Sequence, residues 1–206
     1  MAPGEKAATL TVTNHGTGNT AIQIRAYAWS QKGDEDQLTA SDDVVVSPPL
    51  ATLAPGADQV VRLILRKTPQ GREATYRILL DQIPPPSEPG VVHIVLRLSI
   101  PIFAQPQTRA TQNVQYHIEI DAGQMVLIGV NDGLRHDAIR DIELTASDGR
   151  KLKAAPGSSP YILSGDTRRW NIAAQAPLPL PSETLRLTGH SDAGAVEEQV
   201  RVVAPQ

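Results

Sequence analysis

Short runs of alternating apolar and polar residues, separated by turn residues at spacings of about ten, constrain this chain most. Examples are Leu10–Thr13, Ile22–Arg25, Val60–Leu65 and Tyr76–Leu80, each bounded by Gly, Pro, Asn or Asp. Alternation with period two places successive side chains on opposite faces of a strand. The periodicity of an amphipathic helix is missing, and 17 prolines with 15 glycines argue against long helices. The pattern predicts an all-β protein.

The turn residues between the runs have physical reasons to be there. Asn14-His15-Gly16 tolerates positive φ, and Ala54-Pro55-Gly56-Ala57 suits a type II turn. Gly16-Thr17-Gly18 lies between two predicted strands, where we expect the tip of a hairpin. Many short strands with regular turn signals are typical of a sandwich of two antiparallel sheets.

This pattern runs through the chain twice. A first set of strands ends at Phe103, the polar segment Ala104–Ala110 resembles a linker, and alternation resumes at Tyr116. The second set comprises Tyr116–Ile120, Met125–Val130, Ile139–Leu144, Tyr161–Leu163, Trp170–Ile172, Leu185–Leu187 and Val196–Val203. The sequence therefore predicts two immunoglobulin-like β-sandwich domains, residues 1–106 and 107–206, with Trp29 and Trp170 as one core anchor in each.

Composition excludes several classes of partner. The net charge is -3, and no basic run is longer than Arg168-Arg169, so nothing offers a positive field to nucleic acid. No stretch approaches the roughly 20 apolar residues of a membrane span, so we expect a soluble chain without membrane insertion. The segment Met1–Lys6 has no apolar core of a secretory signal, so an export signal would have to lie outside this sequence.

Catalytic and metal-binding patterns are missing as well. The chain has no cysteine and no Gly-x-Ser-x-Gly, and its histidines lack the spacing that brings imidazoles together. Asp34-Glu35-Asp36 and Ser41-Asp42-Asp43 lack the spaced oxygen ligands of a calcium loop, so we expect both to be solvated loops. We predict no catalytic residue, metal or cofactor. The histidines are His15, His93, His117, His136 and His190.

One segment, Val91–Phe103, departs from this background. Six large aliphatic residues would share one face of a strand there. Pro101 removes one backbone donor, which favours an edge strand over a central one. A long apolar row on an edge strand is an aggregation hazard unless a partner covers it, so the segment suggests strand addition. The six residues are Val92, Ile94, Leu96, Leu98, Ile100 and Ile102.

At this point the chain resembles the PapD-like periplasmic chaperones of pilus assembly over essentially its whole length. The first domain carries the resemblance in Glu5–Asn14, Val46–Pro49 with Leu53–Arg62, and Tyr76–Pro85 followed by Ile100–Pro106. The second domain adds Asn131–His136 and Tyr161–Trp170, which resemble the archaic branch of the family. The resemblance implies two immunoglobulin-like β-sandwich domains in an L-shaped, boomerang arrangement.

The resemblance also implies a function. Such a chaperone donates a strand to an incomplete pilin subunit in the periplasm and delivers the subunit to an outer-membrane usher, without a cofactor. The implied donor residues are Val92, Ile94, Leu96 and Leu98.

Two departures from the family pattern concern the residues that hold the pilin's terminal carboxylate. Pro101 stands where the best-known members have a Lys, so Arg77 and Arg97 are the substitute candidates, and the archaic resemblance favours Arg77. By the same resemblance the sequence starts after the family's first strand. That start would leave an edge uncovered and allow two copies to pair.

Two other functions remain open at this stage. Tandem sandwiches would serve equally well as a cell-surface structural or adhesive module. A sugar-binding or hydrolytic sandwich enzyme would need a cleft with paired carboxylates, which spacing does not locate.

Overall fold

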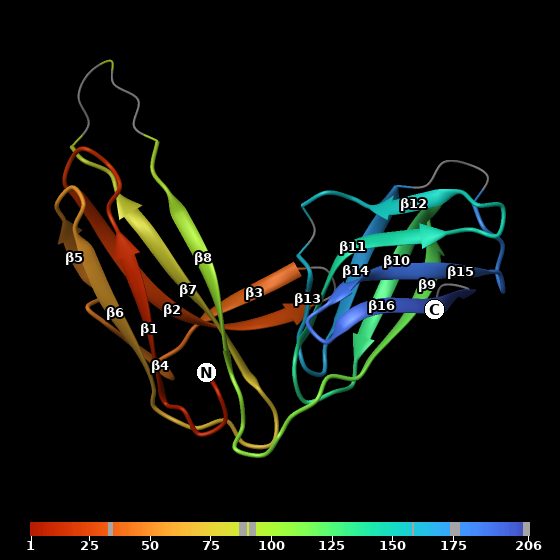
Figure 1. Cartoon of the computed structure of the whole chain (residues 1–206), viewed down its shortest axis with the longest axis horizontal. Coiled ribbons are helices and arrows are strands. Elements are labelled where there is room, and N and C mark those ends of the chain that lie inside the picture. The colour runs from red at the N-terminus through yellow and green to blue at the C-terminus, as the bar shows by residue number, and fades with distance from the viewer. Residues whose placement is uncertain (33–34, 87–89, 91–93, 158, 174–177, 204–206) are drawn as a thin grey trace. The chain divides into compact units, whose positions relative to one another are not determined.

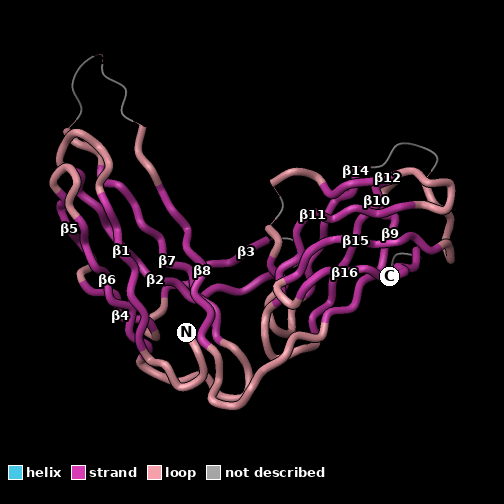
Figure 2. The backbone as a smooth tube through the Cα atoms, in the orientation of Figure 1, coloured by secondary structure: helices cyan, strands magenta, loops and turns pink. Residues whose placement is uncertain are grey.

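The computed structural model describes all residues except 33–34, 87–89, 91–93, 158, 174–177 and 204–206, and every regular element in the described part is a strand (Figures 1 and 2). No helix there is long and apolar enough to span a membrane. The strands are β1 (Ala7–Thr13), β2 (Thr20–Lys32), β3 (Glu35–Ala40), β4 (Val44–Ser47), β5 (Leu50–Leu53), β6 (Asp58–Leu65), β7 (Ala74–Ile83), β8 (Arg97–Ala104), β9 (Val114–Asp121), β10 (Gln124–Asn131), β11 (Asp137–Thr145), β12 (Lys151–Ala154), β13 (Tyr161–Ile162), β14 (Thr167–Ala173), β15 (Thr184–Ser191) and β16 (Gly194–Val203).

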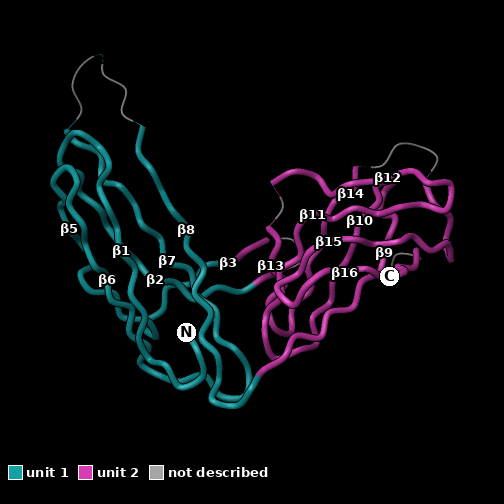
Figure 3. The backbone as a smooth tube through the Cα atoms, in the orientation of Figure 1, with its two compact units in different colours: residues 1–30, 37–109 teal, residues 31–36, 110–206 magenta. Residues whose placement is uncertain are grey.

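Backbone contacts divide the chain into two compact units (Figure 3). Unit 1 contains residues 1–30 and 37–109. Unit 2 contains residues 110–206 together with the short segment 31–36.

Unit 1 consists of two sheets that enclose one core. A three-stranded sheet has the order β1-β6-β4, and a second sheet has the order β3-β2-β7-β8 with β5 added on β2. In β6 and β7 the buried residues alternate with less buried ones, so each strand turns one face inward. The core includes Ile24, Val61, Leu63, Ile78 and Leu80.

Two local predictions for unit 1 have different outcomes. The type II turn is confirmed, because Gly56 has a φ of 71° and Ala57 N donates to Ala54 O at 3.0 Å. The hairpin tip at Gly16–Gly18 is wrong, since β1 pairs with β6 and β2 pairs with β5 and β7. Those residues instead cross from one sheet to the other.

Unit 2 is a nearly continuous ring of strands. Its sheet runs β12-β14-β10-β9-β16-β15-β11-β13, and β12 also pairs with β11, which closes the path on itself. Trp170 is buried inside the ring, and its Nε1 donates to Ser159 O at 3.1 Å. Aliphatic residues provide most of the remaining core, including Ile118, Leu127, Leu144 and Leu187.

The segment 31–36 is fixed to unit 2 by side-chain hydrogen bonds. Gln31 is buried, its Nε2 donates to Tyr161 O at 3.0 Å, and its Oε1 accepts from Leu163 N at 3.0 Å. Asp36 lies 3.3 Å from the buried guanidinium of Arg168. The expectation of a solvated loop is therefore wrong for Glu35 and Asp36, which begin β3, whereas Asp34 lies outside the described residues.

Both units contain the same asparagine device at the end of a strand. Asn14 follows β1, its Nδ2 donates to Gly18 O and Leu53 O, and its Oδ1 accepts from Gly16 N. Asn131 ends β10 and makes the same set of bonds to Arg135 O, Ile162 O and Gly133 N. In each unit one amide thus joins a loop to a short strand that lies later in the chain.

Candidate protein-binding edge

The predicted apolar segment includes the terminal strand of a sheet. Strand β8 is last in the order β3-β2-β7-β8, and in the described part of the chain its sheet partner is β7. The strand begins at Arg97, later than the predicted Val91, and Ile94–Leu96 precede it without strand geometry. Val92, a predicted donor residue, lies outside the described residues.

The apolar row changes from exposed to buried along its length. Ile94 is 93% exposed, Leu96 56% and Leu98 42%. Farther along, Ile100 and Ile102 pack against the core of unit 1, opposite Ile78 and Tyr76 of β7. The row is therefore shared, because its second half completes this chain's own sandwich while Ile94, Leu96 and Leu98 are open to solvent.

A group of polar contacts holds the start of β8 against β7. Gln82 N donates to Leu96 O at 2.9 Å, and Leu96 N donates to the side-chain Oε1 of Gln82 at 3.3 Å. One position along, Asp81 accepts from Arg97 of β8 and, at 2.6 Å, from Arg25 of β2. Hydrogen bonds from Arg97 and then Arg25 lower the pKa of the Asp81 carboxyl, which favours its charged form. We refer to Asp81 and Gln82 as the β7 clasp.

The two predicted anchor arginines have different surroundings. Arg97 is held by Asp81, so its charge already has a counter-ion. Arg77 lies opposite Pro101 on β7, and its guanidinium carbon is 3.7 Å from the centre of the Trp29 ring. Trp29 is buried and contacts Phe103, with ring centroids 5.8 Å apart. Stacking on Trp29 holds the Arg77 side chain in place.

Sequence reasoning missed Asp81, Gln82 and Arg25. Asp81 and Gln82 directly follow the predicted strand Tyr76–Leu80, and Arg25 ends the predicted run Ile22–Arg25. The available signal was that Asp81 and Arg97 flank the Pro-rich loop, so a hairpin register would place them opposite each other. That register depends on the loop length between paired residues, which the alternation pattern does not specify.

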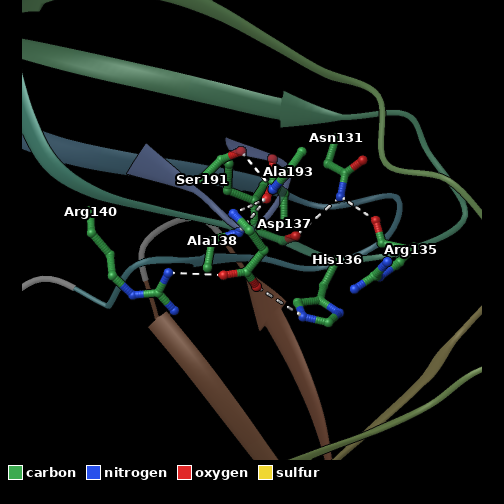
Figure 4. A network of polar contacts seen from close by, with 10 residues as sticks. Asn131, Arg135, His136, Asp137, Ala138, Arg140, Ser191 and Ala193 are labelled. Carbon is green, nitrogen blue, oxygen red and sulfur yellow. Dashed lines mark hydrogen bonds and ion pairs between the residues drawn. The ribbon is translucent and has the colours of Figure 1, made fainter. Parts of the chain in front are cut away.

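A second cluster of titratable residues lies in unit 2, around the start of β11 (Figure 4). Asp137 is buried, and its Oδ1 accepts from Ala138 N at 2.8 Å and from Asp192 N at 3.2 Å. Asp192 in turn contacts Arg140 at 2.9 Å and His136 at 3.7 Å. These contacts connect β11 to the turn after β15, which is a structural role.

A hollow of 780 Å³ on unit 2 has carboxylates among its lining residues, as a hydrolase would require. Each of the three contacts a basic side chain: Glu143 forms an ion pair with Lys151 at 2.8 Å, Glu197 forms one with Arg186 at 2.8 Å, and Asp141 lies 3.6 Å from His190. The Lys151 hydrogen bond lowers the pKa of Glu143, the opposite of what a general acid needs. Among the described residues no cluster of three or more His, Asp or Glu could hold a metal ion.

Comparison with known proteins identifies the family of this chain. Residues 1–110 match the family described as "Pili and flagellar-assembly chaperone, PapD N-terminal domain". The chain belongs to this family. Its members are chaperones and not enzymes. Chaperone protein PapD of Escherichia coli is 32% identical over 136 residues, which are 64% of this chain and 54% of PapD, so the chain spans about half the length of that relative.

Solved structures show the same two-domain immunoglobulin-like fold. The chaperone in the CsuC–CsuE pre-assembly complex, from archaic chaperone-usher Csu pili of Acinetobacter baumannii, matches with a TM-score of 0.70 and 22% identity over 98% of this chain and 94% of that chain. The SafA pilin–SafB chaperone complex of Salmonella enterica matches with a TM-score of 0.61 and 17% identity over 96% and 88%. At these low sequence identities the two matches support the fold alone.

Proposed function

We propose that this chain is a chaperone that binds pilin subunits by donating strand β8 to them, in the periplasm and without a cofactor. The observation that carries the proposal is the exposed row Ile94, Leu96 and Leu98 at a sheet edge. Its family supports the same role, and the CsuC–CsuE and SafA–SafB structures are of chaperones with adhesion or pilin subunits. We assign pilin binding to residues 1–106 and a second immunoglobulin-like domain to residues 107–206, with Val92 extending the donor row.

The energetics of such an edge suit capture of a partner. Each exposed aliphatic side chain that enters a partner pocket contributes roughly 1.5–3 kcal/mol. Backbone hydrogen bonds along β8 add about 1 kcal/mol each and fix the alignment of the two strands. The summed binding free energy must exceed the cost of the translational and rotational freedom that is lost on association. Each of the three exposed residues therefore supplies a large share of the net affinity.

Leu96→Glu tests the proposal directly. The chain is co-expressed with a small pilin subunit, and capture is measured by co-purification and by titration. We expect Leu96→Glu to weaken capture at least about 100-fold, because it removes about 2 kcal/mol of apolar burial and introduces a charge into the partner's pocket. Folding should be unaffected, since Leu96 is exposed in the free chain.

Leu50→Glu is the matched control. Leu50 is 57% exposed and also lies on a short strand of unit 1, but it is far along the sheet order from β8. This variant should capture the subunit as well as the wild type does. Equal capture by Leu96→Glu and wild type would contradict donor-strand binding and favour an adhesive or structural module.

We further propose that Arg77 holds the terminal carboxylate of the bound subunit, in the manner of the archaic branch, and that Arg97 serves the clasp instead. Arg77 is positioned on Trp29, whereas Arg97 is held against β7 by the Asp81 carboxylate, which it shares with Arg25. Arg77→Ala should reduce affinity about 10-fold or more, the effect of losing a charge-assisted hydrogen bond. Arg97→Ala should have a smaller effect in the same titration, and the reverse order would exchange the two roles.

Delivery to an outer-membrane usher is the corresponding next step, because a strand donated by the chaperone has to be replaced in the assembled fibre. A second copy of the chain is another candidate partner for an open edge of unit 1, since β1 also has β6 as its one sheet partner in the described residues. Light scattering of the purified chain tests that idea, and a strictly monomeric molar mass at high concentration would contradict it.

A further inference from the structure

The hydrogen-bonding direction of each residue in β8 follows from one contact. Gln82 N donates to Leu96 O, so Leu96 directs its backbone toward β7. In an antiparallel pair this direction alternates. Leu98, Ile100 and Ile102 therefore also face β7, whereas Arg97, Ser99, Pro101 and Phe103 direct their backbone groups to the open side. The N-terminal amine of Met1 confirms the alternation, because it donates to Phe103 O at 2.6 Å from that open side.

The open side of β8 is thus not uniform. Arg97 and Ser99 each offer an N–H and a C=O to an incoming strand. Pro101 offers a C=O but no N–H. Beyond it, Phe103 O and Gln105 N are both engaged by Met1, the second at 3.2 Å. A complete ladder is available at Arg97 and Ser99 and is interrupted at Pro101.

We propose that Pro101 sets the register of strand addition on β8: a partner strand pairs with the backbone of Arg97 and Ser99 and its pairing ends at Pro101. This inference rests on the proposed function and adds how the partner strand is aligned. Pairing that ends at Pro101 places the end of the partner strand level with Arg77, which lies directly opposite Pro101 on the other side of β8, about 10 Å away at the usual strand spacing.

This alignment matches the exposed side chains. A slip of the partner by two residues toward Ala104 would have to use Pro101 as a donor and displace Met1. It would also move the contact from Leu96 and Leu98 toward Ile100 and Ile102, which are already packed in the core of unit 1. The absent N–H of Pro101 and the burial of the Ile100 and Ile102 side chains therefore disfavour the same two-residue slip.

Ser99→Pro tests the inference by moving the stop two residues earlier. Because the Ser99 N–H points away from β7, the variant should fold, with a melting temperature within a few degrees of that of Ser99→Ala. Ile100→Pro removes a donor that faces β7, so its melting temperature should fall by more than about 10 °C. Subunit capture by Ser99→Pro should weaken about 10-fold relative to Ser99→Ala, the effect of one lost backbone bond. A Ser99→Pro variant that captures like Ser99→Ala would overturn the proposal.

Pro101→Ser supplies the complementary measurement, because it restores the missing N–H. Amide exchange by NMR should show protection of residues 97 and 99 on binding in the wild type, and additional protection of residue 101 in the variant. A residue 101 amide that still exchanges freely in the complex would show that the missing donor does not end the pairing.

A synthetic peptide with the sequence of β7, Ala74–Ile83, separates this inference from the proposed function. As a strand that already pairs with β8, it should add weakly to the open side and perturb the amides of Arg97 and Ser99. Ser99→Pro should abolish that binding, and equal peptide binding by Ser99→Pro and wild type would overturn the inference. If the wild type binds the peptide as expected but captures no fimbrial subunit, only the proposed pilin role is contradicted.

Discussion

The two units share a framework but differ in how their strands end. In both, an asparagine after a strand bonds a loop carbonyl four residues on, a glycine N–H two residues on, and a carbonyl of a short strand. The turn after that short strand also returns to the asparagine backbone, with Gly56 N donating to Asn14 O and Gly165 N to Asn131 O, both at 2.8 Å. Strands β1 and β10 are thus equivalent, as are β6 and β14.

The difference lies at the edges. In unit 2, β12 bridges β11 and β14 and closes the ring, so most ladder groups of its strands are paired within the chain. In unit 1 the five-stranded sheet stops at β8, with the large aliphatics Ile94, Val95, Leu96 and Leu98 exposed at its start. A closed sheet has no strand to offer, whereas an open apolar edge requires a partner. The same framework therefore yields a closed scaffold in unit 2 and an open edge in unit 1, where we propose that the partner binds.

The largest predicted effect on stability comes from replacing the asparagine that each unit has at the same place, Asn14 in unit 1 and Asn131 in unit 2. Asn131 is fully buried, and Asn131→Ala would leave several buried backbone groups without a partner, which we expect to lower the free energy of unfolding by about 3 kcal/mol. Asn14 is 8% exposed, and one of its contacts, Gly18 O, lies in an exposed loop that water can reach. Asn14→Ala should cost about 1 kcal/mol. Urea unfolding of the two variants measures both values.

The glycines of the two devices provide a matched control. A Cβ on Gly133 would lie 2.4 Å from Asn113 N and 2.6 Å from Thr111 O, so Gly133→Ala forces backbone to move. A Cβ on Gly16 would lie 3.1 Å from the side-chain Oδ1 of Asn14, which can adjust. Gly133→Ala should be the more destabilising of the two. If the unit 1 variants cost as much as those of unit 2, the two devices are equally rigid and the comparison loses this distinction.

The sequence predicted the fold class and the repeat because alternation and turn residues are local signals. Runs such as Val60–Leu65 and Met125–Val130 lie in β6 and β10, and Gly56 adopts the predicted positive φ. Short strands were missed: β3, β4, β5 and β12 have six residues or fewer and little alternation. Alternation also does not show which strands pair, and so the Gly16–Gly18 crossing between sheets looked like a hairpin.

The sequence predicted an apolar edge strand, but it did not predict which residues of that strand are exposed. Six aliphatics in alternation and one proline were enough to indicate an edge strand, and β8 is one. The division of that row into exposed and core residues does not follow from pairing with β7, because the exposed Leu98 pairs with Leu80 just as Ile100 pairs with Ile78. It depends on how far the core of unit 1 extends along β8. Likewise, the β7 clasp requires a register that only the folded hairpin supplies. Long-range packing determines the first and long-range pairing the second, and residue type determines neither.

The smallest predicted effect concerns the clasp and its dependence on pH. Arg97 and Arg25 lower the pKa of Asp81 in the folded chain, while an unfolded aspartate titrates near about 3.9. As pH falls, the unfolded chain therefore binds its proton first, and the stability contributed by Asp81 is lost through its lowered folded pKa. Asp81→Asn should cost about 0.5–1 kcal/mol at pH 7, because Arg97 and Arg25 are largely solvent-exposed and screened.

That cost should disappear at low pH, where the wild-type carboxyl is neutral as well. Urea unfolding of both proteins from pH 7 down to pH 2.5 measures the difference, with Asp42→Asn as a control for removing an exposed charge elsewhere in unit 1. Amide exchange of Leu98 should quicken in Asp81→Asn, because the clasp holds the start of β8. A difference that stays constant with pH would show that Asp81 acts through packing and not through its charge, and the open edge would then depend on β7 backbone pairing alone.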